Sequence, residues 1–135
     1  MNPKREFFYR GLFLVSAIYD LVLGIVFTFF YSWAFGLFGI SDQLPKFGGF
    51  LSLIGAFLFV IGIAYWLIYR GDLYKNIDLI TVGTLYKLAY CAIAYTYFAI
   101  GLIPHIIFVA LFGIIDLVMF FFMLECLLYL KKNPN

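Results

Sequence analysis

The sequence predicts an all-α integral membrane protein, in which residues 1–135 form a single domain built as a bundle of four transmembrane helices. Hydrophobic residues make up 66% of the chain and charged residues only 12%, a composition far outside the range of soluble globular domains. Four apolar stretches follow one another and are separated by short polar segments. Because a helix that crosses a bilayer needs about 20 residues, the chain has room for four such helices and for no sizeable soluble domain.

The four spans are expected at about residues 11–35, 48–69, 77–101 and 104–130. The first apolar stretch runs on to residue 40, which is longer than a bilayer requires. We expect its last part, YSWAFGLFGI, to lie partly in the headgroup layer, where tryptophan is a typical residue. The polar segments SDQLPK and RGDLYKN bound the second and third spans. Pro104 is expected in the first turn of the fourth helix, a position that proline tolerates, so the loop before it should be very short.

The distribution of basic residues predicts the orientation of the bundle. Only Lys46 falls on one side of the predicted membrane, whereas the other side carries Lys4, Arg5, Arg10, Arg70, Lys75, Lys131 and Lys132. Cytoplasmic loops and termini carry an excess of lysine and arginine. We therefore expect both termini to be cytoplasmic.

Three ionisable residues, Asp20, Lys87 and Asp116, lie in the middle of predicted spans. Counted along the helix from the nearest cytoplasmic charge, they lie about 15, 18 and 22 Å deep. A charged group at such depth costs about 2.5 to 3.5 kcal/mol, so we expect the three to face the bundle interior and to form one cluster. Two acids and one base leave a formal charge of −1, so either one aspartic acid is protonated or a cation binds there. The alternative is a purely structural ion pair that sets the helix register.

Two tyrosines and the single histidine are candidates for lining a pocket in the same interior. Tyr90 and Tyr97 share the helical face of Lys87, and His105 lies close to the face of Asp116 toward the outer end of the fourth helix. A pocket with an apolar lining and a few convergent polar groups is the usual design of a small-molecule site. These three residues therefore suggest a site for a quinone or a lipid.

The second span carries no charge but has a stripe of small residues, Gly48, Ser52, Gly55 and Gly62. Small residues on one helical face let two backbones approach closely inside a membrane. We expect this stripe to pack against another helix, and a substrate path along it is the alternative.

No pattern in the sequence indicates catalysis. The chain has one histidine, and its cysteines, Cys91 and Cys126, fall within spans, where they are expected to be small packing residues. Neither the spacing of a metal or haem site nor a glycine-rich phosphate loop is present. We therefore predict no metal, no cofactor and no catalytic residue, and the weak net charge gives no sign of a nucleic-acid partner.

Four segments, YDLVLG, FGGFLSLIGAFL, GTLYKLAY and IIDLVMFFF, together resemble the small bacterial four-helix membrane proteins grouped as DoxX-like. The resemblance implies a four-helix bundle in the bacterial inner membrane. Some members of that group are accessory subunits of quinone-linked oxidoreductases, while most have no assigned activity. Arg10 matches the basic residue that is usual near the start of the first helix, whereas YDLVLG departs from the pattern of the group.

Three functions are consistent with these features. The first is a non-catalytic accessory or scaffold subunit that packs against itself or against other membrane subunits. The second is a small proton- or cation-linked transporter or channel that uses Asp20, Lys87 and Asp116. The third is a membrane protein that binds a quinone or a lipid. Small size and the lack of catalytic patterns favour the first.

Overall fold

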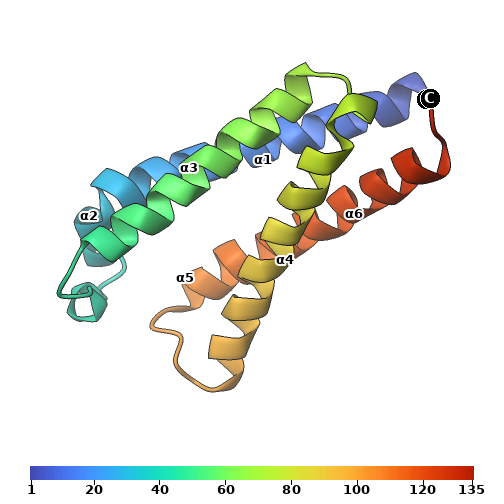
Figure 1. Cartoon of the computed structure of the whole chain (residues 1–135). Helices are drawn as coiled ribbons and strands as arrows, with labels where there is room; N and C mark the ends of the chain where they lie inside the picture. The colour runs from blue at the N-terminus through green and yellow to red at the C-terminus, as the bar shows by residue number, and fades with distance from the viewer.

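Four long helices make up most of the computed structural model, which describes all of residues 1–135 (Figure 1). Helix α1 spans Pro3–Phe29, α3 spans Gly49–Arg70 and α4 spans Ile77–Ala99. The last long helix is continuous from α5 (Ile106–Phe108) through the π-helical η3 (Val109–Ile115) to α6 (Asp116–Lys132). All four are long and apolar enough to cross a membrane, which confirms the predicted all-α bundle of membrane-spanning helices. Short helices lie in the connections: α2 (Tyr31–Leu37), η1 (Ser41–Gln43) and η2 (Tyr74–Asn76).

Helix α1 differs from the predicted first span at both ends. It begins at Pro3, well before residue 11, because the Asn2 side chain accepts a hydrogen bond from the Lys4 backbone N–H and Pro3 occupies the first turn. It ends at Phe29, whereas the predicted span continues to residue 35. Phe30 leaves the helical conformation at φ −123°, and the chain restarts as the separate helix α2. The extra length of the first apolar stretch is thus accommodated by a break.

The loop between α4 and α5 is longer than expected. The prediction that Pro104 lies in the first turn of the last helix is wrong, because α5 begins at Ile106. His105 is its N-cap residue, and its Nδ1 accepts a hydrogen bond from the Ile107 backbone N–H at 3.0 Å. Gly101, at φ +75°, turns the chain away from the end of α4 in the left-handed conformation that favours glycine.

Helices α1 and α3 form the closest pair in the molecule, and the small residues of α3 face α1 and α2. A Cβ atom on Gly55 would lie 2.7 Å from the Gly24 carbonyl oxygen, and one on Gly62 would lie 2.8 Å from Leu21 Cγ. Ser52 Oγ donates a hydrogen bond to the Thr28 carbonyl at 2.9 Å, while Gly48 abuts Tyr31 of α2. The two backbones therefore approach as closely as small-residue interfaces in membranes allow.

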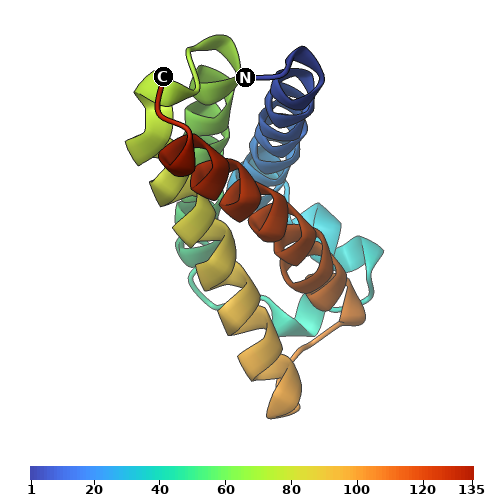
Figure 2. The same cartoon turned by 90° about the vertical axis from the view of Figure 1, so that its right-hand side faces the viewer.

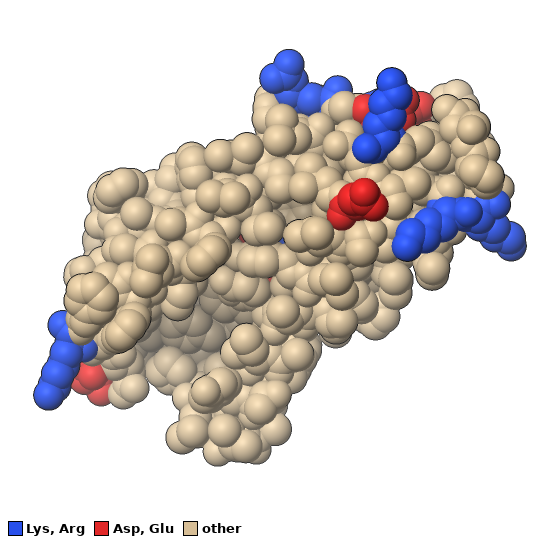
Figure 3. Space-filling model, in the orientation of Figure 1, with Lys and Arg blue, Asp and Glu red and all other residues tan.

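The second pair is formed by α4 and the α5–η3–α6 helix, and the two pairs diverge toward the end opposite the termini (Figure 1). Both termini lie at one end of the bundle (Figure 2). Figure 3 shows most lysine and arginine side chains gathered at that end, a single small charged group at the opposite end and a broad uncharged band between them. This distribution is the one expected of a bundle that crosses a bilayer with its basic end on one side.

Candidate functional site

Asp20, Lys87 and Asp116 are in direct contact in the middle of the bundle, as the sequence predicts. Lys87 Nζ, from α4, donates hydrogen bonds to Asp20 Oδ1 and Oδ2 of α1 at 3.0 and 2.9 Å, and to Asp116 Oδ1 of α6 at 2.9 Å. The side chain of Lys87 is 0% exposed, that of Asp20 is 1% exposed and that of Asp116 is 2% exposed. Three carboxylate oxygens therefore surround the ammonium group, and the cluster ties α1 to the α4–α6 pair.

Two tyrosine rings enclose the ammonium group of the cluster. Lys87 Nζ lies 5.1 Å from the ring centroid of Tyr19 and 5.4 Å from that of Tyr65, distances at which a cation is attracted to an aromatic face. Tyr65 Oη donates to the Gly83 carbonyl and Tyr19 Oη donates to the Leu111 carbonyl, each at 2.7 Å. Sequence reasoning did not assign these tyrosines to the cluster. Their positions in the sequence could have indicated this contact, because Tyr19 adjoins Asp20 and Tyr65 lies one turn after the last glycine of the stripe, Gly62.

The π-helix η3 ends directly at Asp116. Its Leu111 carbonyl accepts the hydrogen bond from Tyr19, and its Gly113 carbonyl lies 3.8 Å from the Cys91 sulfur. Short π-helical segments inside α-helices frequently occur at functional sites. Nothing in the uniformly apolar segment VALFGII indicates this geometry, and sequence reasoning missed it.

The cluster holds two acids and one base and is closed to its surroundings. None of the four main cavities of the molecule is lined by Asp20, Lys87 or Asp116. No three His, Cys, Asp or Glu side chains come together in an arrangement that could hold a metal ion. Chemically, the arrangement can act as a buried ion triad that bridges helices, or it can take up a proton to cancel its formal charge of −1.

A cavity of about 460 Å³ lies where the two helix pairs diverge. Figure 3 shows the molecule hollowed between the part formed by α1–α3 and the protruding connection from α4 to α5. The side chains of the lining are apolar except for the hydroxyl groups of two tyrosines, and the lining consists of Phe27, Phe35, Leu51, Ile54, Tyr90, Ile93, Ala94, Tyr97, Leu102, Ile103, Pro104, Phe108 and Phe112. We call this cavity the outer cleft.

Two of the three predicted pocket residues line the outer cleft. Tyr90 packs against Phe112 of η3 with ring centroids 5.4 Å apart, and Tyr97 lies toward the α4–α5 loop. His105 is not among the lining residues. Its ring packs against Phe38 at 5.2 Å and its Nδ1 caps α5.

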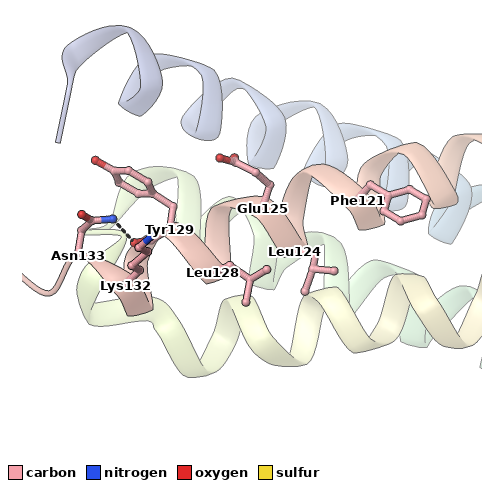
Figure 4. A pocket seen from close by; sticks show the side chains of 7 residues that line it. All are labelled: Phe121, Leu124, Glu125, Leu128, Tyr129, Lys132 and Asn133. Atoms are coloured by element: carbon pink, nitrogen blue, oxygen red, sulfur yellow. Dashed lines mark hydrogen bonds between the residues drawn. The ribbon is translucent and has the colours of Figure 1, made fainter.

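A shallower groove runs along α6 at the end that carries the termini (Figure 4). Glu125 and Tyr129 point toward α1, whereas Leu124 and Leu128 point toward α4. Glu125 Oε2 accepts a hydrogen bond from Tyr9 Oη at 2.6 Å, and its side chain is 49% exposed. Glu125 is thus half exposed and does not join the buried cluster.

Comparison of the chain with protein-family models, curated protein sequences and solved structures finds no match. The resemblance to the DoxX-like group therefore stays a prediction. The function must be argued from the cluster and the outer cleft themselves.

Proposed function

We propose that this chain is a non-catalytic integral membrane protein that binds a neutral hydrophobic molecule in the outer cleft. The observation that carries this proposal is the cleft itself, a concave space of about 460 Å³ with an almost wholly apolar lining and two tyrosines. Its volume falls in the range of small-molecule sites, which are mostly apolar and carry few polar groups. A lipid chain or a quinone, the ligands suggested by the sequence, both fit this chemistry.

The walls of the outer cleft are held by packing that does not depend on a ligand. The close backbone contact of Gly24 and Gly55 fixes the α1–α3 wall, and the hydrogen bonds of Lys87 fix the α4–α6 wall against it deeper in the bundle. A preformed site does not have to be ordered at the moment of binding, so more of the contact energy appears as affinity. Since the cleft lies beside the uncharged band, its ligand would enter from the lipid.

Filling the outer cleft tests the proposal. Ala94 is buried and lines the cleft, so Ala94→Phe places a ring in the space that the ligand would occupy. Ala92 is exposed on the same helix, and Ala92→Phe is the matched control. Lipid extraction and mass spectrometry of the purified proteins should find a ligand in the wild type and in Ala92→Phe and little in Ala94→Phe. No ligand above background, or equal retention in both variants, would remove the support for this function.

Proton- or cation-linked transport through the cluster is a second candidate, which the uncompensated formal charge of Asp20, Lys87 and Asp116 favours. An excess charge in lipid must be neutralised, and a site that binds and releases a proton does so reversibly. Flux across proteoliposomes should then depend on pH, and Asp20→Asn and Asp116→Asn should change that dependence. Unchanged flux in both variants would exclude this candidate.

The accessory or scaffold role expected from the sequence is compatible with ligand binding, and it requires a protein partner. Native mass spectrometry of particles released by a mild detergent tests it. A defined complex with other subunits would place ligand binding within that complex.

For the orientation, we propose that both termini face the cytoplasm of a bacterial cell. The shared position of the termini and the excess of basic residues at that end support this proposal (Figures 2 and 3). Single cysteines introduced at Gln43 and Asn135, which are exposed at opposite ends, provide the test. An impermeant maleimide added to spheroplasts should label the first and spare the second.

A further inference from the structure

A hollow of about 440 Å³ lies between α1 and α6 at the end of the bundle that carries the termini, opposite the outer cleft. We call it the α1–α6 hollow. Glu125 also lines the groove along α6 that Figure 4 shows, so its carboxylate stands between the hollow and the groove. The lining combines charged, polar and aromatic side chains: Asn2, Lys4, Arg5, Phe8, Tyr9, Phe122 and Glu125.

The length of the last helix places this hollow where lipid headgroups meet acyl chains. Residues Ile106–Lys132 number 27, which is about 40 Å of helix and close to the thickness of a bilayer with its headgroups. Glu125 lies about 10 Å before the end at Lys132. Phe8 and Phe122, which line the hollow, are exposed on the outside of the bundle. In a bilayer the hollow is therefore filled by a lipid molecule.

Arg5 brings a guanidinium group with free donors to the α1–α6 hollow. Its guanidinium carbon lies 4.4 Å from the ring centroid of Tyr129, and its Nη2 lies 3.9 Å from Glu125 Oε1, too far for a hydrogen bond. The guanidinium of Arg10, on the same helix, instead donates to Glu6 and to two backbone carbonyls. Arg5 is thus oriented by an aromatic ring while its planar set of donors stays available, an arrangement that suits a phosphate group.

One oxygen of Glu125 is available in the same way. Its Oε2 accepts a hydrogen bond from Tyr9 Oη at 2.6 Å, which holds the carboxylate in place. Its Oε1 accepts no hydrogen bond and has Arg5 Nη2 at 3.9 Å as its nearest cation. A charged N–H donor is the strongest partner for such an oxygen. Free phosphate donors and a free carboxylate oxygen therefore lie side by side.

We propose that the α1–α6 hollow binds the headgroup of a zwitterionic phospholipid whose ammonium group carries N–H donors. The phosphate lies on Arg5 and the ammonium group on Glu125. A short ethylene linker joins these two groups in an ethanolamine headgroup, which matches the adjoining positions of the two side chains. The acyl chains leave along Phe8 and Phe122, whose rings pack edge to face at 5.3 Å. This site is independent of the outer cleft and of its ligand.

Glu125 decides which headgroup is preferred. A choline headgroup has the same charges but no N–H donor, so it leaves Glu125 Oε1 without a hydrogen bond. An anionic headgroup without an ammonium group brings a second negative charge close to Glu125 and nothing to offset it. Lys4 at the rim of the hollow and Lys132 in the neighbouring groove are both exposed, so their attraction for anionic lipids is screened.

Lipid titration of the wild-type chain in a mild detergent, followed by native mass spectrometry, tests the inference with lipids of identical acyl chains. Phosphatidylethanolamine should bind about 2- to 5-fold more tightly than phosphatidylcholine, the range of an ion pair at an exposed site. Its N,N-dimethyl derivative keeps an N–H donor and should bind as phosphatidylethanolamine does. Glycerophosphoethanolamine, the same headgroup without acyl chains, should not displace the lipid. Displacement would assign the site to a soluble phosphate ester and overturn the proposal of a lipid site.

Two variants assign the contacts. Glu125→Gln keeps an acceptor for Tyr9, so it should bring the ratio of the two lipids to about one and leave binding of phosphatidylcholine unchanged. Arg5→Gln should weaken binding of both lipids about 2- to 5-fold, because it removes the phosphate partner. Arg70→Gln, at an exposed arginine of the same end, is the control and should bind both lipids as the wild type does.

Three results would overturn the inference. The first is a wild-type chain that binds both lipids equally, the second is one that prefers phosphatidylglycerol to phosphatidylethanolamine, and the third is a Glu125→Gln variant that keeps the wild-type ratio. The comparison of the lipids on the wild-type chain needs no substitution, so it decides the question even if a variant fails to fold.

Discussion

Replacing Lys87 with methionine removes the only cation between Asp20 and Asp116 and should lower the free energy of unfolding by about 3 to 5 kcal/mol, the cost of removing one partner from a buried ion pair. Methionine keeps most of the side-chain length, so the change is one of charge and hydrogen bonding. Three hydrogen bonds of 2.9 to 3.0 Å are lost at once. Their values do not simply add, because the two acids left behind can become neutral by taking up protons.

The geometry also predicts an order among the three single variants. Lys87 donates to both oxygens of Asp20 but to one oxygen of Asp116, so Asp20→Asn should cost more than Asp116→Asn. Either substitution removes the excess formal charge, which offsets part of the loss, so the order depends on the hydrogen bonds, and for Asp116→Asn, which loses one, we expect a cost of about 1 kcal/mol or less. The triple variant Asp20→Asn, Lys87→Met, Asp116→Asn should recover most of the loss, because no buried charge then lacks a partner.

Unfolding by SDS in mixed micelles, followed by helical circular dichroism, measures these differences. Each variant is compared with the wild type at the same micelle composition. Two results would refute the reasoning: a loss below about 1 kcal/mol in Lys87→Met, or a triple variant as unstable as Lys87→Met. Either would mean that the ammonium group is not what stabilises the contact between α1 and the α4–α6 pair.

Two further predictions use the same unfolding assay. Gly24→Ala should cost about 1 to 3 kcal/mol, because its Cβ would lie 2.7 Å from a backbone nitrogen of α3, whereas Gly11→Ala in the same helix meets no atom within 4 Å and should gain up to about 1 kcal/mol. Equal effects of the two changes would contradict close backbone packing. Arg10→Gln should cost about 1 to 3 kcal/mol, because Arg10 Nη1 donates to two carbonyls at the end of α3 at 2.6 and 2.9 Å. Its control, Arg70→Gln at an exposed position, should stay within about 0.5 kcal/mol of the wild type.

The cluster could be predicted from the sequence because one energy term dominates it. An unpaired charge in lipid costs more free energy than one arrangement of packed apolar side chains differs from another. Asp20, Lys87 and Asp116 are therefore expected to meet, although they lie on three different helices. Glu125 needs no such partner, since it lies half exposed near Arg5, where its charge can stay hydrated. The number of long helices followed from length and hydropathy alone.

The positions of the irregularities in the helices could not be predicted, because the segments that contain them are apolar. In a soluble protein, polar residues would mark the face that turns outward, but lipid and core both accept hydrophobic side chains. The length of the first apolar stretch indicates that its last part, YSWAFGLFGI, leaves the span, but the exact break at Phe30 and the π-helix before Asp116 leave no trace in the hydrophobic pattern. The lining of the outer cleft is hidden for the same reason. Tyr90 and Tyr97 were found only because they share the helical face of Lys87, and the capping role of His105 depends on a loop whose length was mispredicted.

The π-helix η3 joins the two sites that carry the candidate functions, since it supplies Phe112 to the outer cleft and ends at Asp116 of the cluster. A substitution in the cluster can therefore alter the shape of the cleft through η3. For this reason, a ligand-binding assay alone does not distinguish a structural cluster from one that transports ions. The charge-free triple variant makes the distinction, because it keeps the helices together without a titratable group. If it binds ligand as the wild type does and shows no pH-dependent flux where the wild type shows one, the cluster transports and the cleft binds independently. If neither protein shows flux, the cluster serves to hold the two helix pairs at the separation that the cleft requires.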